Sequence, residues 1–184
     1  GFSDVPQGVT YYANRVQIPL YDKNGNIVAA QAIHGNPPEG MPQKQAYGSF
    51  KGASFLIGDI SKANKGVIMA EGFATAYSLH KATGLPTIMA VSSSNFDDVA
   101  AVYREKLPNG APFIIAADND ANQVGLKAAK QAAEVYGKDA IIQMVEFDEA
   151  TRAKFQQQTG SNPSDFNDLA LYGSYAAVKT QIDK

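Results

Sequence analysis

The chain has 184 residues, a formal net charge of −2, 45% hydrophobic and 18% charged residues, and no cysteine. These values are ordinary for a globular protein and exclude a collagen-like or disordered chain, a disulfide scaffold, a zinc ribbon and a thiol nucleophile. The near-neutral charge counts against a stand-alone DNA clamp, because such domains are usually basic. It does not count against a metal-dependent enzyme, whose acidic side chains are offset by the bound cation.

The first 60 residues have the composition of short strands joined by tight turns. The segment Asp22-Lys23-Asn24-Gly25-Asn26 is a typical hairpin turn, because Asn-Gly adopts the backbone angles that such turns require. Strands are predicted at residues 16–21, 27–33, 44–50 and 53–57. We therefore expect a small β-rich subdomain over residues 1–62.

After residue 65 the pattern changes to strands that alternate with helices. Short apolar runs predict buried strands at residues 66–70, 87–91, 112–117 and 140–145. Helices are predicted between them at residues 73–83, 97–107 and 122–136. Such alternation is typical of βαβ units and a mainly parallel sheet. The sequence therefore predicts an α/β domain over residues 63–184, ending in a loop and one helix at residues 169–182.

Acidic residues follow two of the predicted parallel strands. Glu71 comes directly after the first strand, and Asp118 and Asp120 come after the third. In open α/β sheets ligands bind beyond the carboxyl ends of the strands, so these carboxylates converge if the two strands are neighbours. Such hard oxygen ligands suit Mg²⁺ or Mn²⁺, and these ions assist phosphoryl chemistry. Asp165 and Asp168 join the same site if the C-terminal loop packs beside the sheet.

Each acidic residue also has an ordinary structural explanation. An Asp or Asn after a strand is often a helix N-cap, which would account for Asn119, Asp120 or Asp168. Glu71 could lie in a first helical turn, where a negative charge favours the helix dipole. The metal-site hypothesis therefore depends on the combination and order of the residues and not on any one of them.

That combination resembles the toprim domain shared by primases, topoisomerases and some nucleases. The family has a Glu after its first strand and an Asp-x-Asp after its third, here Ala70-Glu71-Gly72 and Asp118-Asn119-Asp120. Four further segments are similar to those of plasmid and phage primases: residues 71–76, 94–96, 122–129 and 164–169. Residues 18–27 and 47–58 resemble the segment that precedes toprim in plasmid-encoded primases. The resemblance covers most of the chain and implies a toprim, Rossmann-like sheet.

The resemblance also implies a role for each matching residue. Glu71, Asp118 and Asp120 would be the catalytic and metal-binding residues, with Asp168 as a further metal ligand. Contacts to nucleotide or DNA would come from Gly72, Asn95, Asp165 and Lys127. The implied cofactor is Mg²⁺ or Mn²⁺, and the implied partners are a single-stranded DNA template, nucleoside triphosphates and further domains of a parent protein.

Three functions are consistent with these residues. The first is a DNA primase that makes RNA primers by Mg²⁺-dependent nucleotidyl transfer for plasmid or phage replication or conjugation. The second is a nuclease of the same superfamily, because no segment supplies the Tyr nucleophile of a topoisomerase. The third is a non-catalytic module that binds nucleotide or DNA within a relaxase or helicase. For each we expect a cytoplasmic protein without a membrane span, since no apolar run approaches the required length.

The remaining conspicuous residues have no partner at a useful spacing in the sequence. His34 and His80 are not expected to be metal ligands, because no second His or Cys lies at ligand spacing. The lysines are scattered, so no basic cluster is predicted beside the acidic residues. Stacking on bases is an alternative for several aromatic residues, but we expect them to pack the β-rich subdomain: Tyr11, Tyr12, Tyr47 and Phe50.

Overall fold

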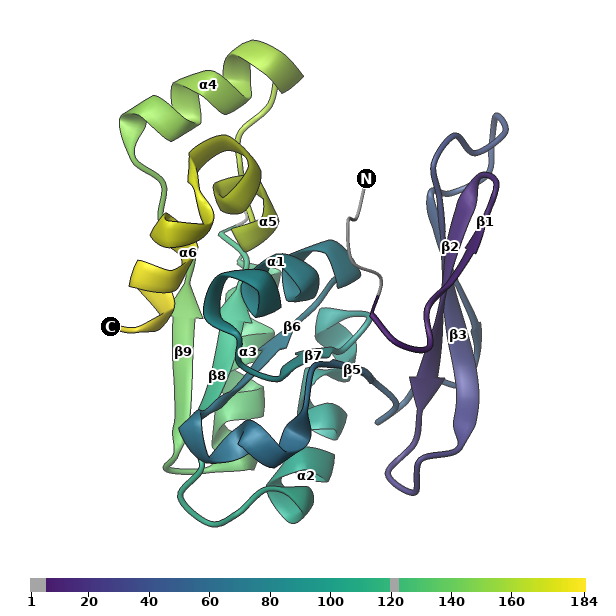
Figure 1. The fold of residues 1–184 in the computed structure, drawn as a ribbon, viewed down its shortest axis with the longest axis vertical. Helices are drawn as coiled ribbons and strands as arrows, with labels where there is room; N and C mark the ends of the chain where they lie inside the picture. The colour runs from purple at the N-terminus through teal and green to yellow at the C-terminus, as the bar shows by residue number, and fades with distance from the viewer. Residues whose placement is uncertain (1–5, 120–122) are drawn as a thin grey trace.

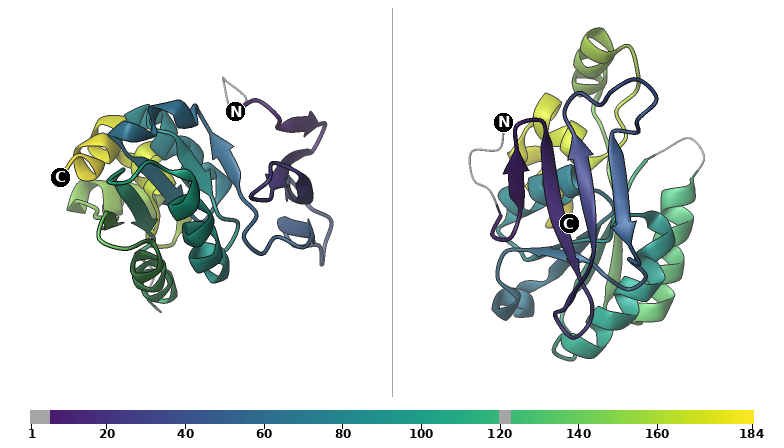
Figure 2. Two further views of the ribbon diagram at one scale, coloured as in Figure 1. Left: turned by 90° about the horizontal axis from the view of Figure 1, so that it is seen from below. Right: turned by 90° about the vertical axis from the view of Figure 1, so that its right-hand side faces the viewer.

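The computed structural model describes residues 6–119 and 123–184, which form two sheets placed side by side (Figure 1). Figure 2 (right) shows the smaller sheet from its outer side, in front of the larger α/β unit. Within the described residues, no helix is long and apolar enough to cross a membrane.

The smaller sheet is antiparallel, with strands in the order β1-β2-β3-β4. Their bounds are β1 Thr10–Tyr12, β2 Arg15–Tyr21, β3 Ile27–His34 and β4 Lys44–Gly48. The predicted hairpin is confirmed: the Asp22 carboxylate accepts hydrogen bonds from the backbone N–H groups of Asn24 (2.8 Å) and Asn26 (2.9 Å). Exposed and buried residues alternate along β2, because one face of the sheet packs on the larger unit.

The larger sheet has the order β5-β7-β6-β8-β9, and every neighbouring pair is parallel except β5 with β7. The strands are β5 Phe55–Ile57, β6 Val67–Ala70, β7 Thr87–Met89, β8 Phe113–Ala117 and β9 Ala140–Met144. The connecting helices are η1 Ile60–Lys65, α1 Phe73–Thr83, η2 Ser93–Asn95, α2 Phe96–Lys106 and α3 Val124–Tyr136. The predicted α/β fold with a preceding β-rich part is confirmed.

Strand residues of the larger sheet alternate between two cores. Ile68 and Ala70 face the core on the side of α1, whereas Val67 and Met69 face the core formed with α2 and α3. Both faces of β6, β7 and β8 are therefore covered, and all their residues are buried. This burial explains why these strands appear in the sequence as unbroken apolar runs.

The C-terminal region differs from the prediction. The chain forms α4 Glu149–Thr159, α5 Phe166–Asp168, the π-helical turn η3 Leu169–Gly173 and α6 Tyr175–Ile182. The single helix predicted for residues 169–182 is wrong, because the chain becomes extended at Ser174, whose hydroxyl then caps α6. Helix α4 was missed because only two of its residues are buried, so no apolar stripe marks it.

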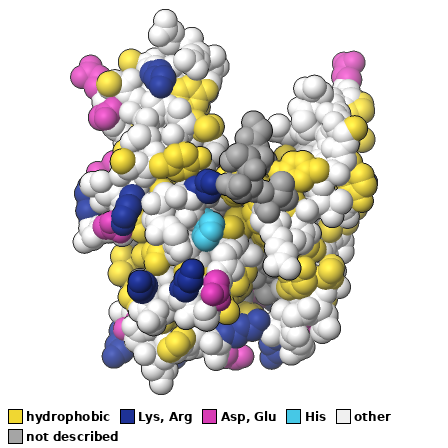
Figure 3. All heavy atoms as spheres, in the orientation of Figure 1, with side chains coloured by type: hydrophobic (Ala, Val, Ile, Leu, Met, Phe, Trp, Pro, Cys, Tyr) yellow, Lys and Arg dark blue, Asp and Glu magenta, His cyan; other side chains and the backbone are white. Residues whose placement is uncertain are grey.

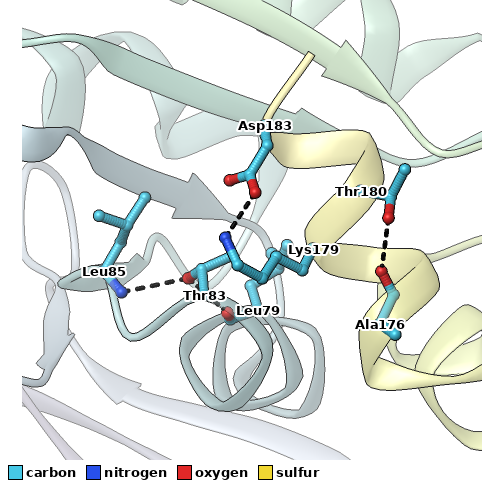
Figure 4. Close-up of polar contacts among 7 residues, drawn as sticks. All are labelled: Leu79, Thr83, Leu85, Ala176, Lys179, Thr180 and Asp183. Carbon is cyan, nitrogen blue, oxygen red and sulfur yellow. Dashed lines mark hydrogen bonds and ion pairs between the residues drawn. The ribbon is translucent and has the colours of Figure 1, made fainter.

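Helix α6 packs beside α1 and contributes to the hydrophobic core on the α1 side of the larger sheet (Figure 4). Thr180 donates to the carbonyl of Ala176 within α6, and Lys179 pairs with Asp183. On α1, Thr83 donates to the carbonyl of Leu79 and accepts the N–H of Leu85, which ends the helix. Helix α6 therefore packs on α1, the helix that begins two residues after Glu71.

The two sheets share one hydrophobic core. Ile18 and Leu20 of β2 pack in the same cluster as Phe55 of β5 and Phe73 of α1. The backbone of Ser54 also exchanges two hydrogen bonds with that of Tyr21 (2.9 and 3.0 Å). The predicted division between residues 62 and 63 stays a prediction, and strand β5, although it precedes residue 63, lies in the larger sheet.

Candidate active site at the carboxyl ends of β6 and β8

The central strand β6 lies between β7 and β8, so the chain crosses over it to reach β8. Helix α1 therefore covers one face of the sheet, and α2 and α3 cover the other. The point between β6 and β8 is a topological switch point, where ligands bind in open α/β sheets. In Figure 3 the upper half of the molecule is split into two lobes, one carrying α4 and the other the antiparallel sheet.

Glu71 and Asp118 follow the carboxyl ends of β6 and β8 at this switch point, at nearly the same height along the two strands. Met69 pairs with Ile115, so Glu71 lies opposite Ala117, one residue before Asp118. Neighbouring strands are about 4.8 Å apart, so the sheet brings the backbones of these two acids together. Both residues are half-buried, which gives a carboxylate a less polar surrounding while leaving it accessible. Asp120, the third predicted ligand, lies outside the described residues.

The ordinary explanations fail for the residues around this point that are described. Helix α1 begins at Phe73 with Gly72 as its N-cap, so Glu71 precedes the helix. Asn119 does not cap α3, whose N-cap is Gln123. Instead the Asn119 side chain donates to the carbonyl of Val145 (3.3 Å). Glu71 therefore does not lie in the first turn of α1, and Asn119 is not the cap of α3.

Asp165 and Asp168 do form a cap. The Asp165 carboxylate accepts the N–H of Asp168 (2.8 Å), and the Asp168 carboxylate accepts the N–H of Ser164 (2.8 Å) and that of Asp165 (3.4 Å). Burial raises the pKa of Asp165, and the nearby Asp168 raises that pKa further. Asp165 is therefore the N-cap of α5, and Asp168 completes the capping box three residues later. The predicted metal contact of Asp168 and nucleotide contact of Asp165 stay predictions.

The C-terminal loop nevertheless packs against the site. The N–H of Asn119 donates to the carbonyl of Ser164 (2.8 Å), and the Thr75 hydroxyl in the first turn of α1 donates to Asp165 (3.1 Å). Ser78 donates to Asn167 in the same way (3.0 Å). The loop thus joins the end of β8 to the start of α1, as the sequence analysis required for Asp165 and Asp168 to lie near the other acids.

A basic residue beside the site was missed. Lys44 of β4 reaches across from the antiparallel sheet, and its ammonium nitrogen lies 3.7 Å from the point that a Cβ on Gly72 would occupy. Lys44 is exposed, and no local pattern predicts this contact, because 27 residues separate Lys44 from Gly72 and a different sheet supplies the lysine. The absence of a basic cluster beside the acidic residues stays a prediction, and the position of this one lysine was not expected.

The two remaining predicted nucleotide contacts, Asn95 and Lys127, differ in exposure. Asn95 is 2% exposed, and its amide is engaged with the backbone of Gly52, Ala53 and Ala90. We therefore no longer expect it to touch a nucleotide. Lys127 is exposed in a depression of about 240 Å³ between α3 and the loop after β7, beside Ser93, Ser94 and Asp97.

The aromatic residues of the antiparallel sheet divide into two groups. Phe50 packs against the shared core as expected. Tyr11, Tyr12 and Tyr47 are 43%, 51% and 53% exposed, so the expected packing role is wrong for them. The Arg15 guanidinium lies 4.6 Å from the centre of the Tyr12 ring. These exposed rings are accessible to a partner in a way that buried core rings are not.

The donor set at the switch point fits a hard divalent cation. Glu71 and Asp118 offer carboxylate oxygens, which Mg²⁺ and Mn²⁺ prefer, and Lys44 offers a positive charge for the phosphate of a bound substrate. In the described part of the chain, no group of three or more His, Cys, Asp or Glu residues is close enough to hold a metal ion by itself. A complete site therefore requires Asp120, water or a substrate oxygen as a further ligand.

The fold and the position of these acids define a toprim-type domain. The Toprim domain family model matches residues 66–174, and the chain belongs to this family. Two curated relatives, both DNA primase TraC from Escherichia coli, are 29% and 30% identical over 137 and 138 residues, or 70% of this chain. The chain covers only 9% and 12% of their lengths. The predicted resemblance to plasmid- and phage-type primases is confirmed.

Primase domains are among the solved structures to which this chain is similar. The primase fragment of the bacteriophage T7 primase-helicase matches with a TM-score of 0.63 and 18% identity, over 95% of this chain and 66% of that one. A DnaG primase catalytic domain bound to single-stranded DNA matches with a TM-score of 0.60 and 14% identity, over 92% and 51%. At these identities the likeness establishes the fold, including the antiparallel sheet in front of the toprim unit.

Proposed function

We propose that this chain is the toprim part of a DNA primase that makes RNA primers on single-stranded DNA by Mg²⁺-dependent nucleotidyl transfer, in plasmid or phage replication or conjugation. One observation carries the proposal: Glu71 and Asp118 leave adjacent parallel strands at the same level, at the switch point of the sheet. The TraC relatives and the DnaG domain bound to single-stranded DNA support the choice of reaction and template. The same proposal places the protein in the cytoplasm, where such DNA is copied.

Each residue of the site has a defined task in this reaction. Glu71, Asp118 and Asp120 would hold Mg²⁺, which neutralises charge on the triphosphate and orients the attacking and leaving oxygens. Lys44 would bind a phosphate of the incoming nucleotide from the opposite side, and Gly72 would leave room for it. Asp165 and Asp168 would hold the start of α1 in place and so keep Glu71 in position.

The division of the chain belongs to the same proposal. Residues 63–184 would be the catalytic domain, and residues 1–62 a subdomain that supplies Lys44. Expression of residues 63–184 alone tests this division. A folded product that binds Mn²⁺ supports it, whereas an unfolded product shows that β5 and the shared core make the chain a single unit.

The test of the function compares wild type with Asp118→Asn in the full-length parent protein. Primer synthesis is measured on single-stranded DNA with labelled nucleoside triphosphates and Mg²⁺, and Mn²⁺ binding by titration calorimetry. We expect Asp118→Asn to lose both. Asp148→Asn is the matched control, because Asp148 caps α4 through the N–H of Thr151 (2.7 Å), away from the switch point. Normal synthesis by Asp118→Asn would refute the proposal.

A further inference from the structure

The linker between the two sheets is held by one buried amide. The Asn95 Oδ1 atom accepts the N–H of Gly52 (2.8 Å), and its Nδ2 atom donates to the carbonyls of Ala53 (3.0 Å) and Ala90 (2.9 Å). Both donors and one acceptor position of the amide are therefore used. Asn95 is 2% exposed, so water does not compete for these bonds.

The three contacts connect segments that are far apart in the sequence. Gly52 and Ala53 belong to the linker after β4, and Ala90 directly follows β7 in the toprim sheet. The next linker residue, Ser54, is paired with Tyr21 at the end of β2. Asn95 thus fastens the antiparallel sheet, through its linker, to the carboxyl end of a strand that neighbours β6.

The neighbouring backbone shows that this junction is tightly constrained. Val91, between Ala90 and η2, has a φ of +74°, which a β-branched residue rarely adopts. Such a conformation persists only where the surroundings enforce it, and Asn95 bonds to the residue directly before Val91. The other contacts between the sheets are largely apolar, and apolar contacts fix no direction. Directional hydrogen bonds at the linker therefore set the angle between the sheets.

We propose that Asn95 is a positioning residue that sets the orientation of the antiparallel sheet so that Lys44 stays beside Gly72 and Glu71. Its effect on nucleotide binding rests on the proposed function, whereas its effect on the orientation of the sheet does not. The hydrogen bonds printed for the Asn95 side chain go to Gly52, Ala53 and Ala90, so within the described residues it acts on Lys44 through the linker.

The orientation can be measured directly because the chain has no cysteine. Spin labels are attached at Tyr47→Cys in β4 and Ile141→Cys in β9, where both side chains are about half exposed. Pulsed electron resonance then gives the distribution of distances between the sheets. We expect one narrow distribution for wild-type Asn95 and a broader one for Asn95→Ala. Hydrogen exchange at the Gly52 amide should also be faster in Asn95→Ala.

Two further variants separate positioning from general destabilisation. Tyr103→Phe removes the contact between the Tyr103 and Ser54 hydroxyls (3.4 Å), which also joins the linker region to α2, but leaves the Asn95 bonds intact. We expect it to keep the narrow distribution and the slow Gly52 amide. Asn95→Asp keeps an acceptor for Gly52 and loses the donors to Ala53 and Ala90. Hydrogen exchange at the Gly52 amide should therefore stay slow, while the distribution of distances between the spin labels still broadens. Asn95→Asp is also the test variant if Asn95→Ala does not fold.

The functional consequence is measured with Mn²⁺ and a nucleoside triphosphate. We expect Asn95→Ala to bind Mn²⁺ as wild type does and to bind the nucleotide about tenfold more weakly, the size of one lost charged hydrogen bond. Failure of the wild type to bind nucleotide would count against the proposed function and leave the distance measurement valid. A narrow distribution and a slow Gly52 amide in folded Asn95→Ala would overturn the positioning role.

Discussion

In the antiparallel sheet only β2 and β3 contain buried residues, whereas every residue of the parallel strands β6, β7 and β8 is buried. The two sheets also contribute differently to the candidate site. The parallel sheet supplies Glu71 and Asp118 from its strand ends, where the backbone fixes their position. The antiparallel sheet supplies Lys44 from an exposed strand, where the position depends on how the whole sheet is docked. The topology of the parallel sheet therefore fixes the acidic half of the site, whereas the position of Lys44 depends on the linker between the two sheets.

The largest expected effect tests the difference in burial. Ile68 in β6 is fully buried, and we expect Ile68→Ala to lower the free energy of unfolding by about 2–5 kcal/mol, because it leaves a cavity in a core that cannot collapse. Ile27 in β3 is 65% exposed, and the same substitution there should cost less than about 0.5 kcal/mol. Urea denaturation followed by circular dichroism measures both. Equal losses would contradict the comparison.

Glu71→Gln tests the half of the site that the topology fixes. We expect primer synthesis by the full-length protein to fall about 100-fold or more, because the neutral amide is a poor ligand for a hard cation and cannot act as a base. The melting temperature should change little, since Glu71 is half-buried at a strand end. Synthesis within a factor of two of wild type would remove Glu71 from the site.

Lys44→Ala tests the half of the site that depends on docking. We expect nucleotide affinity to fall about tenfold, or about 1.4 kcal/mol, while Mn²⁺ affinity stays near that of wild type, because the lysine meets a phosphate and not the cation. Lys51→Ala is the matched control, since Lys51 is also exposed but pairs with Asp98 (3.8 Å). If both variants behave alike, the effect is general electrostatics and Lys44 has no specific contact.

The smallest expected effect concerns the hairpin that joins β2 to β3. Hydrogen bonds from the backbone, led by that of Asn26, lower the pKa of Asp22. Because the folded-state pKa is depressed, the stabilising contribution is present above the unfolded value of about 3.9 and is lost as the pH falls through the folded value. The melting temperature of Asp22→Ala should therefore be slightly lower than that of wild type at pH 6 and equal to it near pH 2.

Melting curves between pH 2 and 6 measure this difference. Glu39→Ala removes an exposed carboxylate from the loop after β3 and controls for a general effect of charge. If the melting temperatures of wild type and Asp22→Ala differed by the same amount down to pH 2, the Asp22 side chain would stabilise the turn by some means other than its charge.

Local patterns were sufficient to predict most of the fold. The apolar runs of β6 and β8 are visible because both faces of these strands are buried, and helix α1 was predicted with its observed bounds because Gly72 and Gly84 mark its ends. Helix α4 was missed because it has no apolar stripe. Its limits are set by the Asp148 cap and by Gly160 in the left-handed conformation, and these signals alone did not indicate a helix.

The sequence by itself determined which acids end the parallel strands, because a strand, its apolar run and the residue after it are contiguous in the chain. Only the tertiary structure decided that Lys44 lies beside Gly72, that Asp165 caps a helix and bonds to Thr75, and that Asn95 holds the linker. Each of these contacts joins segments that are distant in sequence, or depends on burial that appears only when the two sheets pack. Local sequence patterns do not predict such long-range packing, and the roles of these residues depend on that packing.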